Sequence, residues 1–140
     1  MAPNPDINAY FFALDVSGQN IAVFTSVSGL EMTFDSYEYQ EGGNNGFVHR
    51  LPGTIRHPNI VLTRPITSDK SLFQWVLQTQ QAAKTSDVSV TMTDTTGNPI
   101  QKWTFGDAFP LRWTGPSVEA NGAYVALETV EITHSGMKVE

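Results

Sequence analysis

The side chains able to do acid, base or metal chemistry in this chain are few and lie far apart. Its histidines, His49, His57 and His134, lie in unrelated segments without His-x-x-x-His or Glu-x-x-His spacing, so we expect surface or turn histidines and no metal site. There is no cysteine, which excludes a thiolate metal site, a cysteine nucleophile and a disulfide framework. Ser28 lies in the sequence Val-Ser-Gly-Leu, which lacks the Gly-x-Ser-x-Gly elbow of a serine hydrolase.

Paired carboxylates and a glycine-rich segment are the remaining candidates for catalysis or phosphate binding. Glu38 with Glu41, or Glu128 with Glu131, could meet as a glycosidase pair, but the second pair falls on different faces of a regular strand unless a bulge intervenes. The segment 41–46 (EGGNNG) lacks the Lys-Ser/Thr of a P-loop and does not open a helix. We therefore predict no enzymatic activity and no cofactor.

Tryptophan and charge patterns argue against nucleic-acid binding. The chain has 8 Lys and Arg against 14 Asp and Glu, a formal charge of −6, with the basic residues scattered singly. A stacking platform for single strands needs basic residues among its aromatics, yet only Lys102 and Arg112 sit beside tryptophans. Packing in a core or interface is the favoured role for Trp75, Trp103 and Trp113.

Length and composition predict a single domain over residues 1–140. A chain of 140 residues buries about two thirds of the surface that its unfolded form exposes. No segment reads as a leader peptide or as the roughly 18 apolar residues of a membrane span, so we expect a soluble protein without a membrane anchor. Only 16% of residues are charged, below the usual quarter, which is compatible with surfaces covered by other subunits.

The hydrophobic pattern predicts about seven strands and one helix. Strands are expected at 10–16 and 21–27, joined by a turn at 17–20, then at 47–51 (ended by Pro52-Gly53), 59–64, 88–93, 100–105 and 124–133. Segment 106–121 is punctuated by Pro and Gly and is expected to be irregular, with Phe109, Trp113 and Val118 as anchors. The fold class is therefore mainly β, a β-barrel or two-sheet sandwich with one flanking α-helix.

The helix is expected at 70–84 and the last strand carries an irregularity. Apolar residues recur at helical spacing at Leu72, Phe73, Val76 and Leu77. Ser68 or Asp69 is expected to cap the first turn, and Lys84 suits the other end. In the last strand the apolar residues stand first at odd positions, Val125 and Leu127, and then at even positions, Val130 and Ile132. This change predicts either a bulge near 128–129 or a strand that is covered on different faces along its length.

Residues 31–46 form a long connection with no chemistry in it. Most connections in compact domains have about four to six residues, and the aromatic content of this one argues against a solvated tail. We interpret it as an arm that grips something.

Seven short sequences, in this order, resemble the tail tube proteins of contractile-tailed phages and phage-tail-like contractile injection systems. They are 27–31 (VSGLE), 39–43 (YQEGG), 51–53 (LPG), 59–64 (NIVLTR), 72–75 (LFQW), 109–116 (FPLRWTGP) and 125–132 (VALETVEI), the last followed by 134–136 (HSG). The resemblance spans nearly the whole chain. Each sequence alone is weakly specific, whereas seven in register are strong support. Pro65 departs from the pattern, which places glycine after Arg64.

The resemblance implies a structural inner tube subunit that forms hexameric rings stacked into a rigid conduit within a contractile sheath. Its implied partners are further copies of itself, the sheath protein, baseplate or hub and terminator proteins, and effector cargo or DNA in the lumen. Assembly would occur in the cytoplasm, and the product would be a virion-like or extracellular particle. Neighbouring subunits would complete a continuous barrel, with the long connection reaching a neighbour.

The predicted inter-subunit contacts lie in the arm, the first hairpin and the last strand. They are Glu31, Phe34, Tyr37, Tyr39, Glu41, Gly42, Gly43, Tyr10, Phe12, Val125, Leu127 and Glu128. Two alternatives stay open: an exported ring protein of type VI secretion that carries effectors, like the related haemolysin-coregulated tube proteins, and a monomeric β-barrel that binds a small apolar ligand.

Overall fold

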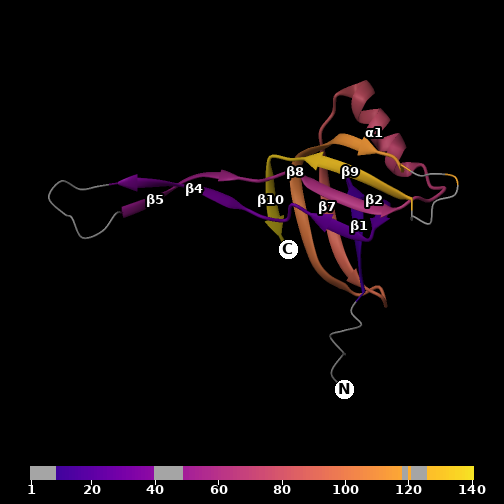
Figure 1. Ribbon diagram of the computed structural model, residues 1–140, viewed down its shortest axis with the longest axis horizontal. Coiled ribbons are helices and arrows are strands. Elements are labelled where there is room, and N and C mark those ends of the chain that lie inside the picture. The colour runs from indigo at the N-terminus through magenta and orange to yellow at the C-terminus, as the bar shows by residue number, and fades with distance from the viewer. Residues whose placement is uncertain (1–8, 40–48, 118–119, 121–125) are drawn as a thin grey trace, which may run out of the picture.

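The protein is a strongly curled antiparallel sheet with one helix on its flank and a separate two-stranded hairpin that projects from it (Figure 1). The computed structural model describes residues 9–39, 49–117, 120 and 126–140. Its elements are β1 (Tyr10–Val16), β2 (Gln19–Phe24), β3 (Ser26–Ser28), β4 (Thr33–Tyr39), β5 (His49–Arg56), β6 (Ile60–Pro65), α1 (Ser71–Ala82), β7 (Ser86–Asp94), β8 (Pro99–Thr114), β9 (Leu127–Thr133) and β10 (Gly136–Val139). The predicted class, mainly β with one helix, is confirmed.

The first hairpin forms as predicted but with a tighter turn. Ser17 and Gly18 have φ values of 52° and 83°, the left-handed pair that a two-residue hairpin turn requires. Val16 therefore pairs directly with Gln19, so the turn is shorter than the expected 17–20. Leu14 is fully buried, and Phe12 and Val16 pack against the core, as their shared parity predicts.

The sheet is curled because β2 and β3, which follow each other in the chain, lie at its two opposite edges. The strand order runs β2-β1-β7-β8-β9-β6-β3, and β2 and β3 are separated only by Thr25. The Thr25 amide donates a hydrogen bond to the Thr63 carbonyl (3.0 Å), which ties this corner to β6. The single strand expected at 21–27 is thus two strands with different partners.

The longest strand, β8, was predicted only in its first part. Residues expected to be irregular continue it to Thr114, because a bulge at Asp107 (φ 50°) bends the strand instead of ending it. Its first half pairs with β7 and β10, and its second half pairs with β9. Strand β10 was not predicted, and the proposed anchor Val118 lies outside the described residues.

Side chains from six strands and the helix fill the interior. The largest fully buried ones are Phe24, Phe105, Leu14, Ile60, Leu62, Leu72, Ile132, Val88, Val90 and Val130. Strand β7 turns Val88 and Val90 into this interior. In the helix, Leu72 is buried as expected, but the second buried residue is Trp75, and the expected Phe73 and Leu77 are 42% and 38% exposed.

The helix begins where Asp69 ties down its first turn. The Asp69 carboxylate accepts hydrogen bonds from the Ser71 amide (3.0 Å) and hydroxyl (2.8 Å), and these bonds lower the pKa of Asp69. The N-cap position itself is Lys70, which makes no side-chain cap bond. The helix ends at Ala83 in the left-handed conformation, so Lys84 lies just beyond it.

Candidate assembly surface

The long connection predicted at 31–46 belongs to a β-hairpin formed by β4 and β5. We define the arm as residues 31–56, which include both strands. Strands β4 and β5 pair with each other and with no other strand of the described residues, and they extend away from the curled sheet along the longest axis (Figure 1). The predicted end of the strand at 47–51 is wrong, because β5 continues through Pro52 and Gly53 to Arg56. Proline is tolerated here because the hairpin is two-stranded and each strand has a free edge.

A glycine lets the two strands of the hairpin close around an aromatic ring. A Cβ on Gly53 would collide with the Tyr37 ring and would lie 2.9 Å from the Asp35 carbonyl oxygen. Only glycine fits this approach without displacing β4. The register shifts between Phe34 and Ser36, which indicates a bulge beside this contact.

Both faces of the hairpin expose large apolar side chains. Tyr37 pairs with Leu51, and Phe34 pairs with Ile55. Because successive residues of a strand point to opposite faces, the two pairs lie on opposite sides of the hairpin. The four side chains are 46–58% exposed. A two-stranded hairpin in water is at best marginally stable, so apolar pairs on both faces indicate that other surfaces cover it.

Asp35 of β4 and Arg56 of β5 form a surface ion pair at the end of the hairpin nearer the body. Arg56 Nε lies 3.0 Å from Asp35 Oδ1 and donates a hydrogen bond to Oδ2 (3.1 Å). The two side chains are 72% and 32% exposed, a setting in which an ion pair contributes about 0–1 kcal/mol.

The predicted contact residues fall into three groups. Glu31, Phe34 and Tyr37 are exposed in the arm, Leu127 is 48% exposed at the start of β9, and Tyr10 and Phe12 are partly buried in β1. Tyr39 is placed by its backbone in β4. Glu41, Gly42, Gly43 and Val125 lie outside the described residues.

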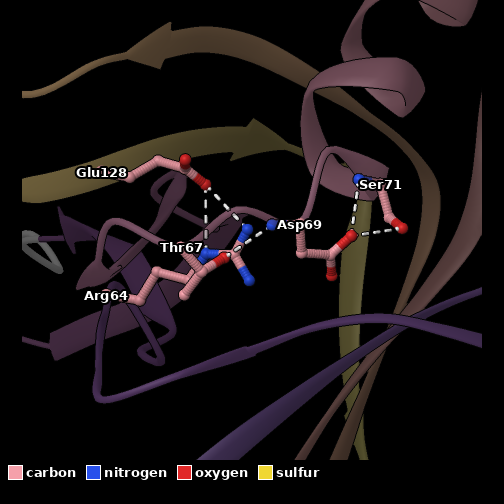
Figure 2. A network of polar contacts seen from close by, with 5 residues as sticks. All are labelled: Arg64, Thr67, Asp69, Ser71 and Glu128. Carbon is pink, nitrogen blue, oxygen red and sulfur yellow. Dashed lines mark hydrogen bonds and ion pairs between the residues drawn. The ribbon is translucent and has the colours of Figure 1, made fainter.

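Glu128 lies inside the subunit, so we no longer propose its side chain as an inter-subunit contact. It is 4% exposed, and its Oε1 accepts a hydrogen bond from Arg64 Nε (3.1 Å) and lies 3.0 Å from Nη2 (Figure 2). Arg64 is also 4% exposed, and its guanidinium lies over the Phe24 ring, 5.5 Å from the centroid. The two residues are directly opposed in β6 and β9.

This ion pair explains the change of parity in the last strand. Strand β9 pairs with β6 without a shift from Leu127 to Ile132, so the bulge predicted near 128–129 is wrong. Leu127 points outward, and Glu128 takes the inward position ahead of Val130 and Ile132. The irregularity lies in β8, between Pro110 and Arg112.

The position of Arg64 in β6 is a signal in the sequence for its burial. In β6 the inward positions are Ile60, Leu62 and Arg64, so the arginine shares the parity of two fully buried residues. An arginine and a glutamate, each in phase with buried residues, can reach each other across paired strands. Figure 2 also shows the segment between Arg64 and α1. There the Asp69 amide donates a hydrogen bond to Thr67 Oγ1 (3.2 Å).

His57 and His134, expected as surface or turn residues of unrelated segments, lie side by side at the root of the arm. The rings of His57 and His134 are 5.6 Å apart, and His134 packs edge-on against Phe105. His134 Nε2 lies 3.2 Å from the Pro58 carbonyl oxygen. Burial lowers the pKa of His134, and the nearby His57 lowers it further, although the hydrogen bond to Pro58 opposes this.

Three strands of the body have an unpaired edge. Within the part of the chain that the structure describes, β2 pairs only with β1, β3 pairs only with β6, and β10 pairs only with β8. An unpaired edge is a template for another strand. The described residues contain no group of three His, Cys, Asp or Glu that could hold a metal ion and no helix long and apolar enough to cross a membrane.

Open edges together with an uncovered apolar hairpin are typical of a protein that assembles with other subunits. Residues 8–138 match the family of the T4-like virus tail tube protein gp19. The chain belongs to this family. No curated protein matches it.

Solved structures give the same fold. A chain of the anti-feeding prophage baseplate, 6-fold symmetrised, matches with a TM-score of 0.78 and 22% identity over 100% of this chain and 97% of that one. A chain of the sheath-tube complex of the extracellular contractile injection system PVC gives 0.76 and 26% over 92% and 87%. Hcp1 from Salmonella typhimurium is more distant, at 0.56 and 19% over 94% and 85%.

Proposed function

We propose that this protein is a structural inner tube subunit of a contractile injection system or phage-like tail, with residues 1–140 as a single tail-tube domain. The observation that carries the proposal is the family match over residues 8–138. It is supported by the surfaces that the described part of the subunit leaves uncovered, which are an apolar hairpin and the unpaired edges of β2, β3 and β10.

In the proposed assembly, six copies form a ring and rings stack into a rigid conduit. The matched anti-feeding prophage chain belongs to a 6-fold symmetrised baseplate, and the matched PVC chain belongs to a sheath-tube complex. By analogy, the partners of this chain are its own copies, the sheath, the baseplate or hub and the terminator. Closed rings pair the open edges of neighbouring sheets.

The proposed role needs no catalysis by the subunit. The subunit would contribute its shape and its contacts with other subunits, and the lumen of the assembled tube would pass effector cargo or DNA. The formal charge of −6 would limit adhesion of anionic cargo. We infer assembly in the cytoplasm, followed by residence in a virion-like or extracellular particle.

The second candidate, an exported ring protein of type VI secretion, has weaker support. The Hcp1 structure has a TM-score of 0.56, against 0.76–0.78 for the two injection-system chains. Free single rings that accumulate in culture medium, without sheath-bound tubes, would favour the exported ring.

A monomeric ligand-binding barrel is the third candidate. Its interior would need room for a ligand, whereas the curled sheet is filled by fully buried side chains such as Phe24, Phe105 and Leu14. This candidate predicts a monomer whose melting temperature rises with an apolar ligand.

Electron microscopy of the purified protein, alone and mixed with its sheath and baseplate proteins, tests the proposal. We expect rings or tubes of constant diameter. A protein that sediments as a monomer under all these conditions and forms no tubes would contradict the proposed function.

A further inference from the structure

Both ends of the arm meet the body at one joint. Before the arm, Gly29 packs so closely on β6 that a Cβ there would collide with the Asn59 carbonyl oxygen. After the arm, His57 follows directly, and Asn59 Nδ2 donates a hydrogen bond to Glu131 Oε1 of β9 (3.2 Å). Within the part of the chain that the structure describes, no hydrogen bond joins β4 or β5 to another element. The position of the arm therefore depends on this joint.

Two imidazole rings close the joint. His57 from the arm side and His134 from the turn between β9 and β10 have ring centroids 5.6 Å apart, and His134 also packs edge-on against Phe105. His134 Nε2 lies 3.2 Å from the Pro58 carbonyl oxygen. Because a carbonyl oxygen only accepts, this bond places the hydrogen of the neutral His134 ring on Nε2 and leaves Nδ1 without one.

The Nδ1 atoms of both rings are buried and have no hydrogen-bond partner among the described residues. Protonation of His134 would add an N–H group and a positive charge at its buried Nδ1, which costs free energy when no acceptor is present. If the two rings move apart, Nδ1 becomes accessible to water, and water can accept the new hydrogen bond. Protonation therefore favours an open joint.

No carboxylate of the described residues compensates a charge on these rings, since neither ring forms an ion pair. The carboxylates beside the joint already accept other bonds: Glu131 from Asn59, and Asp107 Oδ2 from the Ser135 hydroxyl (3.3 Å). The cavity that His57 lines is bordered by two acidic and two basic side chains, so it holds no excess of negative charge. They are Asp87, Lys102, Lys138 and Glu140.

The surroundings of His134 favour its neutral form. Burial is the largest influence and lowers the pKa of His134, and the neighbouring His57 lowers it further. The main-chain groups of Pro58 and Gly136 act in the opposite direction without cancelling these effects, so the pKa of His134 stays below the ordinary 6.5. The closed joint thus binds a proton on His134 less tightly than a water-exposed histidine does.

We propose that the His57–His134 contact makes the joint between body and arm pH-sensitive, closed while His134 is neutral and open when it is protonated. The joint belongs to the single subunit, so this property goes beyond the proposed function and does not depend on tube formation. Since the open joint binds the proton more tightly, the fraction of open joints increases as the pH falls below about 6.5. Between pH 7.5 and 5.5, one such histidine can raise this fraction by at most about tenfold.

Hydrogen exchange of the dispersed wild-type subunit at pH 7.5 and 5.5, corrected for the intrinsic pH dependence of exchange, tests the proposal. We expect segments 56–60 and 133–136 to exchange about three- to tenfold faster at pH 5.5, because these amides become accessible when the joint opens. Strand β7, which pairs on both edges with β1 and β8, should change by less than about twofold. Unchanged exchange at the joint, or equal acceleration in β7, would overturn the proposal.

Two variants of His134 assign the response to this residue. In His134→Gln a neutral side chain can still donate to the Pro58 carbonyl, and in His134→Phe an aromatic ring can still pack against Phe105. Each should reduce the acceleration at the joint to less than about twofold, and either one suffices if the other does not fold. The matched control is His49→Gln, because His49 lies at the other end of β5, and it should respond like the wild type. A full response in a folded His134 variant, or its loss in His49→Gln, would overturn the role of His134.

Discussion

The body and the arm of this protein each contain an ion pair of the same length in opposite surroundings. Glu128 Oε1 and Arg64 Nη2 are 3.0 Å apart, with side chains 5–6% exposed. Arg56 Nε and Asp35 Oδ1 are also 3.0 Å apart, but their side chains are 72% and 32% exposed. The two pairs therefore contribute differently to stability despite their equal distances. A buried charge without its partner destabilises the fold, whereas an exposed charge without its partner is solvated by water.

The same contrast holds for apolar side chains. The body turns its large residues inward, and ten of the largest have less than 2% of their surface exposed. In the arm, Phe34, Tyr37, Leu51 and Ile55 are each about half exposed. Substitutions in the body should therefore change folding stability, and substitutions in the arm should change assembly.

The largest expected effect on stability comes from Glu128→Ala. It leaves the Arg64 charge buried without a partner, so we expect a loss of about 3–5 kcal/mol in the free energy of unfolding, measured by urea denaturation. The matched arm variant Asp35→Ala should lose about 0–1 kcal/mol. Equal losses for the two variants would remove the contrast between body and arm.

Replacing both residues of the buried ion pair distinguishes the effect of their charges from the effect of their side-chain volume. The variant Arg64→Met/Glu128→Leu should recover most of the stability lost in Glu128→Ala, because well-packed apolar residues can replace a buried ion pair at little cost. Failure to recover, with a folded spectrum retained, would show that the ion pair itself specifies the β6–β9 register.

Two crowded glycines should give the next largest effects. Gly29 has φ +90°, and a Cβ there would collide with the Asn59 carbonyl oxygen, so Gly29→Ala should cost about 1–3 kcal/mol of folding stability. Gly53→Ala places a Cβ against the Tyr37 ring and the Asp35 carbonyl oxygen. Both contacts lie within the arm, so the urea midpoint should stay nearly unchanged while tube yield falls. A lowered midpoint in Gly53→Ala would show that arm and body unfold as one unit.

Acid should weaken the junction between body and arm by a smaller amount. The pKa of His134 is lowered in the folded protein, so the unfolded chain binds more protons once the pH falls below about 6.5. Stability should therefore decrease as pH falls from 7 toward 5, by at most about 1.4 kcal/mol per pH unit for this one group. A flatter pH profile is expected for His134→Gln, and an identical profile would assign the effect to other groups.

The smallest effect on stability is expected for Tyr37→Ser/Leu51→Ser. Both side chains already face water in the subunit, so the free energy of unfolding should change by less than about 0.5 kcal/mol. Tube formation should nevertheless be lost. Calorimetry of the isolated subunit checks the first expectation, and pelleting of assembled tubes checks the second.

Local patterns in the sequence predicted the body better than the arm. Alternation and turn residues located β1, β2, β6, β7 and most of β9, because each of these strands buries one face in its own subunit. Strand β8 was cut short in the prediction, since Gly106 and Pro110 look like breakers in the sequence. In the structure the strand continues through bulges at Asp107 and between Pro110 and Arg112.

The arm was recognised as unusual but not as a hairpin. Its strands expose apolar residues on both faces and contain Pro52 and Gly53, so the alternation typical of a half-buried strand is missing. The buried Arg64–Glu128 pair was missed for a different reason: charged residues are rarely fully buried, and only the β6–β9 register shows that they meet. Residues that depend on another subunit, or on a partner distant in the chain, leave little local signal.

The most direct test of the whole account is electron microscopy of wild-type protein and Tyr37→Ser/Leu51→Ser at equal concentration, with matching circular dichroism spectra. We predict tubes for the wild type and dispersed subunits for the variant. Tubes of equal number and length in both samples would contradict the assembly role of the arm, and no tubes in either would contradict the proposed function.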